Sequence, residues 1–208
     1  MRKSILNFSI VTFIILVAVL ACMGTSKKKD GILVPVGSAT IADSSLLVER
    51  GAYLVNSIGC ADCHSPKTMG ANGPEIIPEL DLSGFPSNGT VPPIDLSSIS
   101  NGWIMFNPDG TSHLGPWGQT FAANLTSDPS GIGNWTEENF IRAIREGKYK
   151  GLENSRDLLP LMPWYFYKNL TDEDLISIFY YLKTTRPVSN IVPPPISLED
   201  LKRNWSAK

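Results

Sequence analysis

The sequence predicts a mostly α-helical fold with a long loop rich in glycine and proline inserted into it. Three segments repeat apolar residues at the spacing of an amphipathic helix, at about 46–59, 136–147 and 171–187. Between the first two of these segments, residues 65–120 are rich in Gly, Pro, Ser and Asn and show no such spacing. The length of 208 residues, without an internal sequence repeat, indicates a single domain.

The first helix is expected at about 46–59, and Gly59 is expected to end it. Gly51 lies on its apolar face, although a glycine in a helix interior costs about 1 kcal/mol. This glycine therefore indicates the close approach of another helix. We expect Phe179 and Leu182 of the last helix to pack there.

The two later helices have clear boundaries in the sequence. Thr136 is suited to cap the second helix, and Gly147 to close it. Thr171 is suited to cap the last helix, which Pro187 prevents from continuing. Residues 188–208 contain three consecutive prolines and are expected to be an extended C-terminal tail that wraps the surface.

The inserted loop is expected to contain short elements, because unstructured loops of this length are uncommon in compact domains. A hairpin is predicted for residues 103–114 around the turn Asn107-Pro108-Asp109-Gly110. His113, which follows this turn, is interpreted as a surface residue.

The first helix leads directly into Cys60-Ala61-Asp62-Cys63-His64, a Cys-x-x-Cys-His pattern typical of c-type haem attachment. Two thiols three positions apart on one helical turn can each add to a vinyl group of haem. The histidine that follows places its imidazole beneath the iron as an axial ligand. The pattern therefore predicts one covalently bound haem c, with Cys60 and Cys63 as its attachments and His64 as an iron ligand.

Two other uses of a Cys-x-x-Cys pair are disfavoured. A redox pair of the thioredoxin type has no need of His64 and is expected in a βαβ context, which the sequence does not show. A zinc site requires a second pair of ligands, and His113 alone cannot supply one.

Four side chains are candidates for the sixth iron ligand, and Met162 is favoured. Prolines two residues before it and one residue after it lack backbone donors and favour an extended chain. Such a segment holds a thioether in one direction, as an iron ligand requires. The other candidates are Met69, Met105 and His113, and a flexible filler of the core is the alternative role for Met162. Thioether ligation would give a higher reduction potential than ligation by two imidazoles.

Residues 1–22 are expected to be a lipoprotein-type signal peptide outside the fold. A basic start precedes a 12-residue apolar stretch, from Ile10 to Ala21, which is short for a membrane span. The run Val19-Leu20-Ala21-Cys22 resembles the lipobox of bacterial lipoproteins, which implies lipidation of Cys22. An uncleaved anchor at residues 5–23 is the alternative. Both interpretations place the protein in the bacterial cell envelope, tethered to the membrane and facing the periplasm. The attachment of haem to thiols is expected on the same side of the membrane.

The charge balance argues against nucleic acid as a partner. Removal of Arg2 and Lys3 with the signal leaves 16 basic and 20 acidic residues, a net charge of −4, whereas nucleic-acid binding calls for a basic footprint. Residues 23–44 show no periodicity and are expected to form a tether. The run Lys27-Lys28-Lys29 within it is interpreted as a solvated linker or as a contact to anionic lipid head groups.

Five further motifs carry a family resemblance. They are Arg50–Val55, Asn124–Pro129, Gly131–Thr136, Met162–Trp164 and Leu170–Leu175. Together with the Cys-x-x-Cys-His pattern, they resemble class I cytochrome c domains, and in particular the haem domains in cytochrome subunits of membrane-bound alcohol and sugar dehydrogenases. The resemblance covers about residues 48–195. Those subunits usually carry three such domains, whereas this sequence contains one Cys-x-x-Cys-His pattern.

The resemblance implies a class I cytochrome c fold, with about three to five helices around one haem, at residues 45–187. In the family, the residues that match Cys60 and Cys63 form thioether links, the match of His64 is the proximal ligand and the match of Met162 is the distal ligand. Several polar and aromatic side chains are interpreted either as wall packing or as contacts to the haem propionates. These are Asn124, Trp135, Trp164, Tyr165, Phe166 and Tyr167.

The function expected from these observations is electron transfer by a monohaem c-type cytochrome, between a dehydrogenase and a terminal acceptor. If protein fills both axial positions, no small-molecule substrate and no catalytic residue are expected, and the partners are redox proteins. One alternative is a haem enzyme or gas sensor in which Met162 is labile or does not bind. Another is a structural subunit with a vestigial haem.

Overall fold

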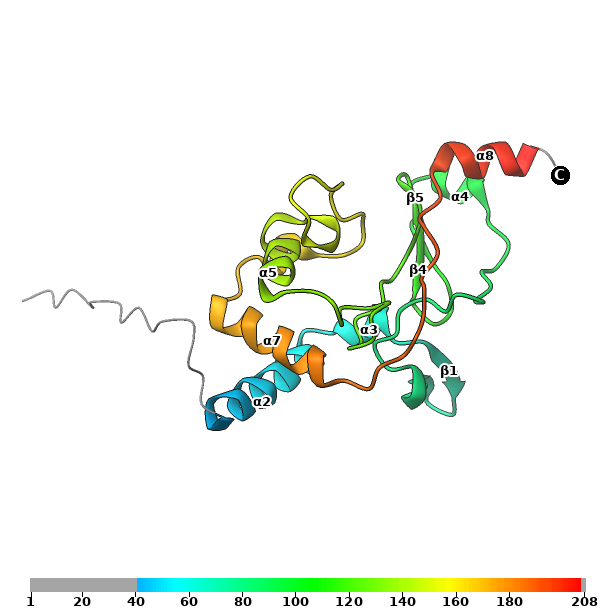
Figure 1. Ribbon diagram of the computed structural model, residues 1–208. Coiled ribbons are helices and arrows are strands. Elements are labelled where there is room, and N and C mark those ends of the chain that lie inside the picture. The colour runs from blue at the N-terminus through cyan, green and yellow to red at the C-terminus, as the bar shows by residue number, and fades with distance from the viewer. Residues whose placement is uncertain (1–40, 207–208) are drawn as a thin grey trace, which may run out of the picture. The chain divides into compact units, whose positions relative to one another are not determined.

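The computed structural model describes residues 41–206, which lie within one compact unit. This part of the chain contains seven α-helices and two small antiparallel sheets (Figure 1). The expectation of a mostly α-helical fold therefore holds only in part. Cys22, the signal segment 1–22 and the tether up to residue 40 lie outside the described residues.

The helices and strands have the following bounds. The α-helices are α2 (Ile41–Ser57), α3 (Cys60–His64), α4 (Leu96–Ser100), α5 (Glu137–Glu146), α6 (Trp164–Tyr167), α7 (Asp172–Thr184) and α8 (Leu198–Ser206). The strands are β1 (Lys67–Gly70), β2 (Gly73–Ile76), β3 (Met105–Phe106), β4 (Ser112–Gly115) and β5 (Gly118–Phe121). Short 3-10 turns occupy Pro78–Leu80 and Tyr149–Gly151.

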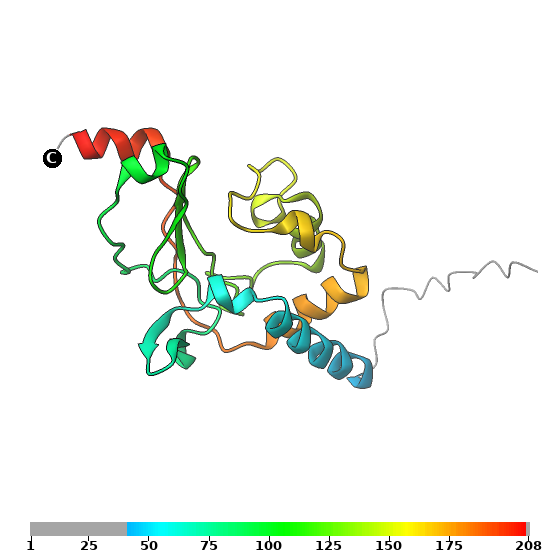
Figure 2. The same cartoon turned by 180° about the vertical axis from the view of Figure 1, so that it is seen from behind.

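Helix α2 packs along α7, as the glycine in its sequence predicts (Figures 1 and 2). A side chain at Gly51 would overlap the carbonyl group of Ser177 and the Cβ of Tyr181. The close approach is therefore confirmed, but Ser177 and Tyr181 lie at the contact point where we expected Phe179 and Leu182. Those two residues are instead buried in the core beside the crossing. Helix α2 begins at Ile41, earlier than expected, and therefore includes the end of the predicted tether.

Helices α5 and α7 begin where their caps predict. The Thr136 hydroxyl accepts a hydrogen bond from the backbone N–H of Asn139, whose side chain in turn accepts one from the Thr136 backbone. Gly147 ends α5 in the left-handed conformation, with φ of 67°. The Thr171 hydroxyl caps α7 in the same way, by accepting from the backbone N–H of Asp174.

The main core joins three long helices. Leu54 and Val55 of α2 meet Phe140 and Ile144 of α5 and the buried face of α7, which includes Leu175 at 0% exposure. Burial of apolar area at such positions contributes roughly 1.5–3 kcal/mol for each large side chain. Cys60 and Met162 lie at the edge of this same cluster, so the core also positions the candidate haem residues.

The inserted region forms the two sheets. Strands β1 and β2 make one hairpin, whereas β3, β4 and β5 make a three-stranded antiparallel sheet in sequence order. The predicted hairpin around Asn107–Gly110 is confirmed as β3–β4. Its turn is held by the Asp109 carboxylate, which accepts hydrogen bonds from Asn107 and from the backbone and hydroxyl of Thr111.

The C-terminal segment differs from the fully extended tail that we expected for 188–208. The extended part pairs Ile196 with Gln119 of β5 through two backbone hydrogen bonds. Helix α8 follows, and Leu201 packs with Leu114 and Ile99 in a second, smaller core (Figures 1 and 2). The prolines 193–195 favour an extended chain, but they precede the helix and do not prevent it.

No helix among residues 41–206 combines the length and the apolar character needed to cross a membrane.

Candidate haem site

Helix α3 presents the two thiols. It begins after Gly59, which adopts the left-handed conformation with φ of 78° and so turns the chain sharply between α2 and α3. Cys60 and Cys63 are both free thiols and both partly buried. Burial raises the pKa of Cys60 from 9.0 to about 11, and burial with the nearby Asp62 carboxylate also raises the pKa of Cys63. The two thiols are therefore neutral at pH 7.

His64, at the end of α3, is buried and oriented by a backbone carbonyl. Its Nδ1 lies 2.7 Å from the carbonyl oxygen of Ala123, and a carbonyl can only accept, so Nδ1 carries the proton. Burial lowers the pKa of His64 and keeps the ring neutral. Its Nε2 is thereby left with a free lone pair, which is the state in which an imidazole ligates iron.

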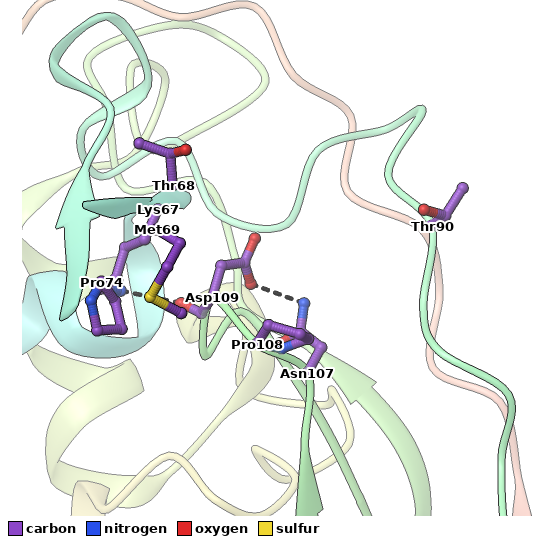
Figure 3. Close-up of a pocket in the computed structure, with 8 residues that line it drawn as sticks. All are labelled: Lys67, Thr68, Met69, Pro74, Thr90, Asn107, Pro108 and Asp109. Carbon is purple, nitrogen blue, oxygen red and sulfur yellow. Dashed lines mark hydrogen bonds between the residues drawn. The ribbon is translucent and has the colours of Figure 1, made fainter. Parts of the chain in front are cut away.

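Lys67 stabilises α3 in a way that sequence reasoning did not anticipate. Its ammonium group lies within 3.2 Å of four carbonyl oxygens, those of Ala61, Asp62, Ser65 and Asp109. Three of these carbonyls belong to α3 or follow it. The fourth, that of Asp109, belongs to the β3–β4 turn, and Figure 3 labels Asp109 together with Lys67. A lysine shortly after a short helix is the available sequence signal, because cations favour helix C-termini.

The three candidate methionines occupy different environments. Met162 packs at the edge of the main core, in the same cluster as Cys60. Met105 packs against the second core. Met69 of β1 is 71% exposed and lines a surface hollow together with Asn107 and Pro108 (Figure 3). Of these three methionines, Met162 is thus the one that packs against the same cluster as residues of α3.

The segment before Met162 is held by the inserted sheet. The Thr120 hydroxyl of β5 donates a hydrogen bond to the carbonyl of Pro160 at 2.9 Å. The β3–β4 turn of the same sheet reaches α3 through Lys67, whose ammonium group donates to the Asp109 carbonyl and to the carbonyls of Ala61 and Asp62. The inserted region therefore connects α3 with the segment of Met162.

His113 is not a surface residue, contrary to our expectation. It lies in β4 and is only 5% exposed, because the strand continues beyond the predicted turn into a sheet that is covered on both sides. The Phe106 ring meets it edge-on at 4.9 Å between ring centroids.

Several of the other polar and aromatic candidates make packing or loop contacts. The amide nitrogen of Asn124 donates to the carbonyl of Val188, and its oxygen accepts from the backbone and hydroxyl of Thr126. The Tyr167 hydroxyl donates to the carbonyl of Ile58 at 3.0 Å. Trp135 packs against the main core. Tyr165 and Phe166, in contrast, are 52% and 66% exposed.

The residues present suit a c-type haem. Two adjacent thiols, a neutral imidazole with a free nitrogen, and a thioether in the same apolar cluster are the donors that such a group requires. The apolar surroundings favour the haem macrocycle, which is itself largely apolar.

The proteins whose sequences are similar to this chain include components of dehydrogenases. The chain is 32% identical over 171 residues to a component of nicotinate dehydrogenase from Pseudomonas putida, a match that covers 79% of this chain and 11% of that protein. It is 30% identical over 143 residues to the fructose dehydrogenase cytochrome subunit of Gluconobacter japonicus, with coverage of 68% and 22%. It is 28% identical over 170 residues to the gluconate 2-dehydrogenase cytochrome c subunit of Pantoea cypripedii, with coverage of 77% and 30%.

The resemblance to dehydrogenase cytochrome subunits is confirmed. Haem c is the cofactor that this resemblance implies, in agreement with the Cys-x-x-Cys-His pattern. The matched part of this cytochrome-like chain spans less than a third of the length of each of these relatives. No protein-family model matches the chain.

Proposed function

We propose that the protein is a monohaem c-type cytochrome that carries single electrons and performs no substrate chemistry of its own. The observation that carries this proposal is the arrangement of α3. Its two thiols and the free Nε2 of His64 lie on one short helix, at the edge of the core that also includes Met162.

Each of these residues has a defined task in electron transfer. The bound haem supplies a reversible one-electron couple. Cys60 and Cys63 fix its position, and the Ala123 carbonyl holds the ring of His64 in one orientation. Met162 supplies the sixth ligand. Its thioether stabilises the reduced state of the iron more than a second imidazole would. Two protein ligands leave the iron without an open position for a substrate.

A dehydrogenase is the proposed electron donor. Relatives that match this chain are named as cytochrome subunits of fructose, gluconate and alcohol dehydrogenases. A terminal acceptor on the same side of the membrane would complete the pathway.

The proposed location is the periplasmic face of the bacterial cell envelope, with a lipid on Cys22. This follows from the apolar segment before that residue and its lipobox-like sequence. Stable attachment would need the several acyl chains of a mature lipoprotein, because one chain binds a bilayer only marginally. Mass spectrometry of the membrane-extracted protein tests this, and a mature N-terminus other than lipidated Cys22 would favour the uncleaved anchor.

The Met162→Ala variant of the haem-loaded protein tests the axial assignment. We expect the red-edge absorbance of ferric sulfur ligation to disappear and the reduction potential to fall. The matched control is Met69→Leu, which alters an exposed methionine and should leave both unchanged. An unaltered ferric spectrum in Met162→Ala would contradict the assignment. Rapid carbon monoxide binding to the reduced wild-type protein would instead indicate a gas sensor or a haem enzyme.

A further inference from the structure

His113 has a buried ring nitrogen that no other residue in the described part of the chain satisfies. The residue is 5% exposed, and its Nε2 has no hydrogen-bond partner among the described residues. Burial lowers the pKa of His113, against a smaller opposing effect of the Gly110 backbone, and keeps the ring neutral. A neutral imidazole carries one proton, so the unpartnered Nε2 can present a lone pair while that proton is on Nδ1. Buried polar atoms without a partner are rare in native proteins, so this one calls for a ligand.

The register of the sheet shows which way His113 faces. Phe106, His113 and Thr120 are directly paired across β3, β4 and β5, and paired residues project from the same face of a sheet. Thr120 donates to the carbonyl of Pro160, two residues before Met162. His113 thus lies on the face of the sheet that contacts the chain just before Met162, the proposed sixth ligand.

His113 and His64 are alike in two respects. Burial keeps both rings neutral, and in neither does Nε2 have a hydrogen-bond partner among the described residues. A neutral imidazole with a free Nε2 has the donor atom that a metal-ligating histidine needs. The two rings are also close enough that charge on His113 lowers the pKa of His64. They therefore belong to one buried region.

We propose that His113 is a reserve axial ligand, whose Nε2 binds the haem iron when Met162 leaves the sixth position. This inference rests on the proposed function, because it assumes a haem ligated by His64. The exchange breaks one Fe–S bond and forms one Fe–N bond. It moves no electron and releases no proton, because the neutral imidazole keeps its one proton on Nδ1 while Nε2 binds the iron. A second imidazole lowers the reduction potential relative to a thioether, so the protein has two states of different potential.

The test compares three haem-loaded variants by ferric absorption and electron paramagnetic resonance spectra. They are Met162→Ala, His113→Phe and the double variant. We expect Met162→Ala to be low-spin with two nitrogen ligands, and the double variant to lose this signal and become high-spin. His113→Phe alone should keep the sulfur-ligated spectrum. Covalent haem content and far-ultraviolet circular dichroism verify that each variant is folded. If the double variant does not fold, Met162→Ala with His113→Gln takes its place.

The outcomes separate this inference from the proposed function. A high-spin Met162→Ala variant, equal to the double variant, would overturn the reserve role and leave the cytochrome assignment intact. A low-spin double variant would overturn it as well, because another group would then be the ligand. If the His113→Phe substitution alone removed the low-spin signal that the wild-type protein shows, His113 would be the sixth ligand of the wild-type protein. The reserve role and the Met162 assignment would then both fail. A chain that binds no haem would refute the proposed function itself.

Discussion

The helical region and the inserted region approach the candidate haem site by different means. The helical region, α2 with α5 and α7, is held by a shared apolar core, and α3 and Met162 lie at the edge of that core. The inserted region between Lys67 and Phe121 meets the site mostly through hydrogen bonds, from Lys67 to the Ala61 and Asp62 carbonyls, from Gly84 to the His64 carbonyl and from Thr120 to the Pro160 carbonyl. One of its side chains, Leu82, also lies in the main core. Apolar packing thus dominates in the helical region, whereas hydrogen bonds dominate where the insertion joins the site. The two regions should respond differently to substitution.

The largest effect is expected for the double substitution Cys60→Ala and Cys63→Ala in the helical region. Each thiol supplies one thioether, so covalent haem should be lost completely. Acid–acetone extraction followed by measurement of haem on the protein tests this. The single variants, each with one remaining link, are the controls. Haem that resists extraction in the double variant would mean that the attachment does not depend on α3.

Gly51→Leu tests the packing of α2 on α7. The new side chain would overlap backbone atoms of Ser177, which cannot move aside without displacing the helix. We expect a loss of about 3 kcal/mol in the free energy of unfolding, at the upper end of usual overpacking costs. Denaturant unfolding measures it. Asn56→Leu, at an exposed position of the same helix, should change stability by less than about 0.5 kcal/mol. Equal stability of the two variants would mean that the helices do not cross at Gly51.

Lys67→Met tests the join between the insertion and the haem-binding helix. It leaves four carbonyl oxygens without their cationic donor, and hydrogen bonds to charged groups contribute about 1.5–3 kcal/mol. Solvent at this partly exposed site reduces the expected loss to about 1–2 kcal/mol. Hydrogen exchange should show faster opening of the Asn107–Gly110 turn than of α7. Lys148→Met, which removes an exposed ion pair with Asp157, is the control and should cost less than about 1 kcal/mol.

The smallest effect is expected for Thr120→Val, which removes one hydroxyl and keeps the shape of the side chain. The Pro160 carbonyl loses its donor, at a cost of about 1 kcal/mol. Thr120→Ser keeps the hydroxyl and should recover most of that loss in the same unfolding assay. A Thr120→Val variant as stable as the wild type would show that the insertion does not hold the Met162 segment through this bond.

The same contrast explains how much the sequence predicts. Helix periodicity and caps locate α5 and α7, and Gly51 predicts a helix crossing, because these are local consequences of residue type. The Cys-x-x-Cys-His pattern likewise coincides with a short helix, α3.

The insertion is less predictable because its order depends on distant partners. The β3–β4 hairpin has a local turn signal, but β5 is completed by Ile196, far along the chain. In the sequence His113 is only the neighbour of a turn, and the sheet around it is what explains its burial. Lys67 likewise meets Asp109 across 42 positions. Contacts of this kind leave no periodic pattern in the sequence.

The pairing of Ile196 with Gln119 has a consequence for solubility. A sheet edge with free N–H and C=O groups is a template on which another chain can add a strand, and so a route to aggregation. The C-terminal segment occupies this edge of β5 through two backbone hydrogen bonds, and α8 follows it immediately. Truncation before residue 188 would uncover that edge while leaving α2, α5 and α7 intact. The shortened protein should retain α2, α5 and α7 and yet self-associate, so the C-terminal segment protects the protein from its own copies.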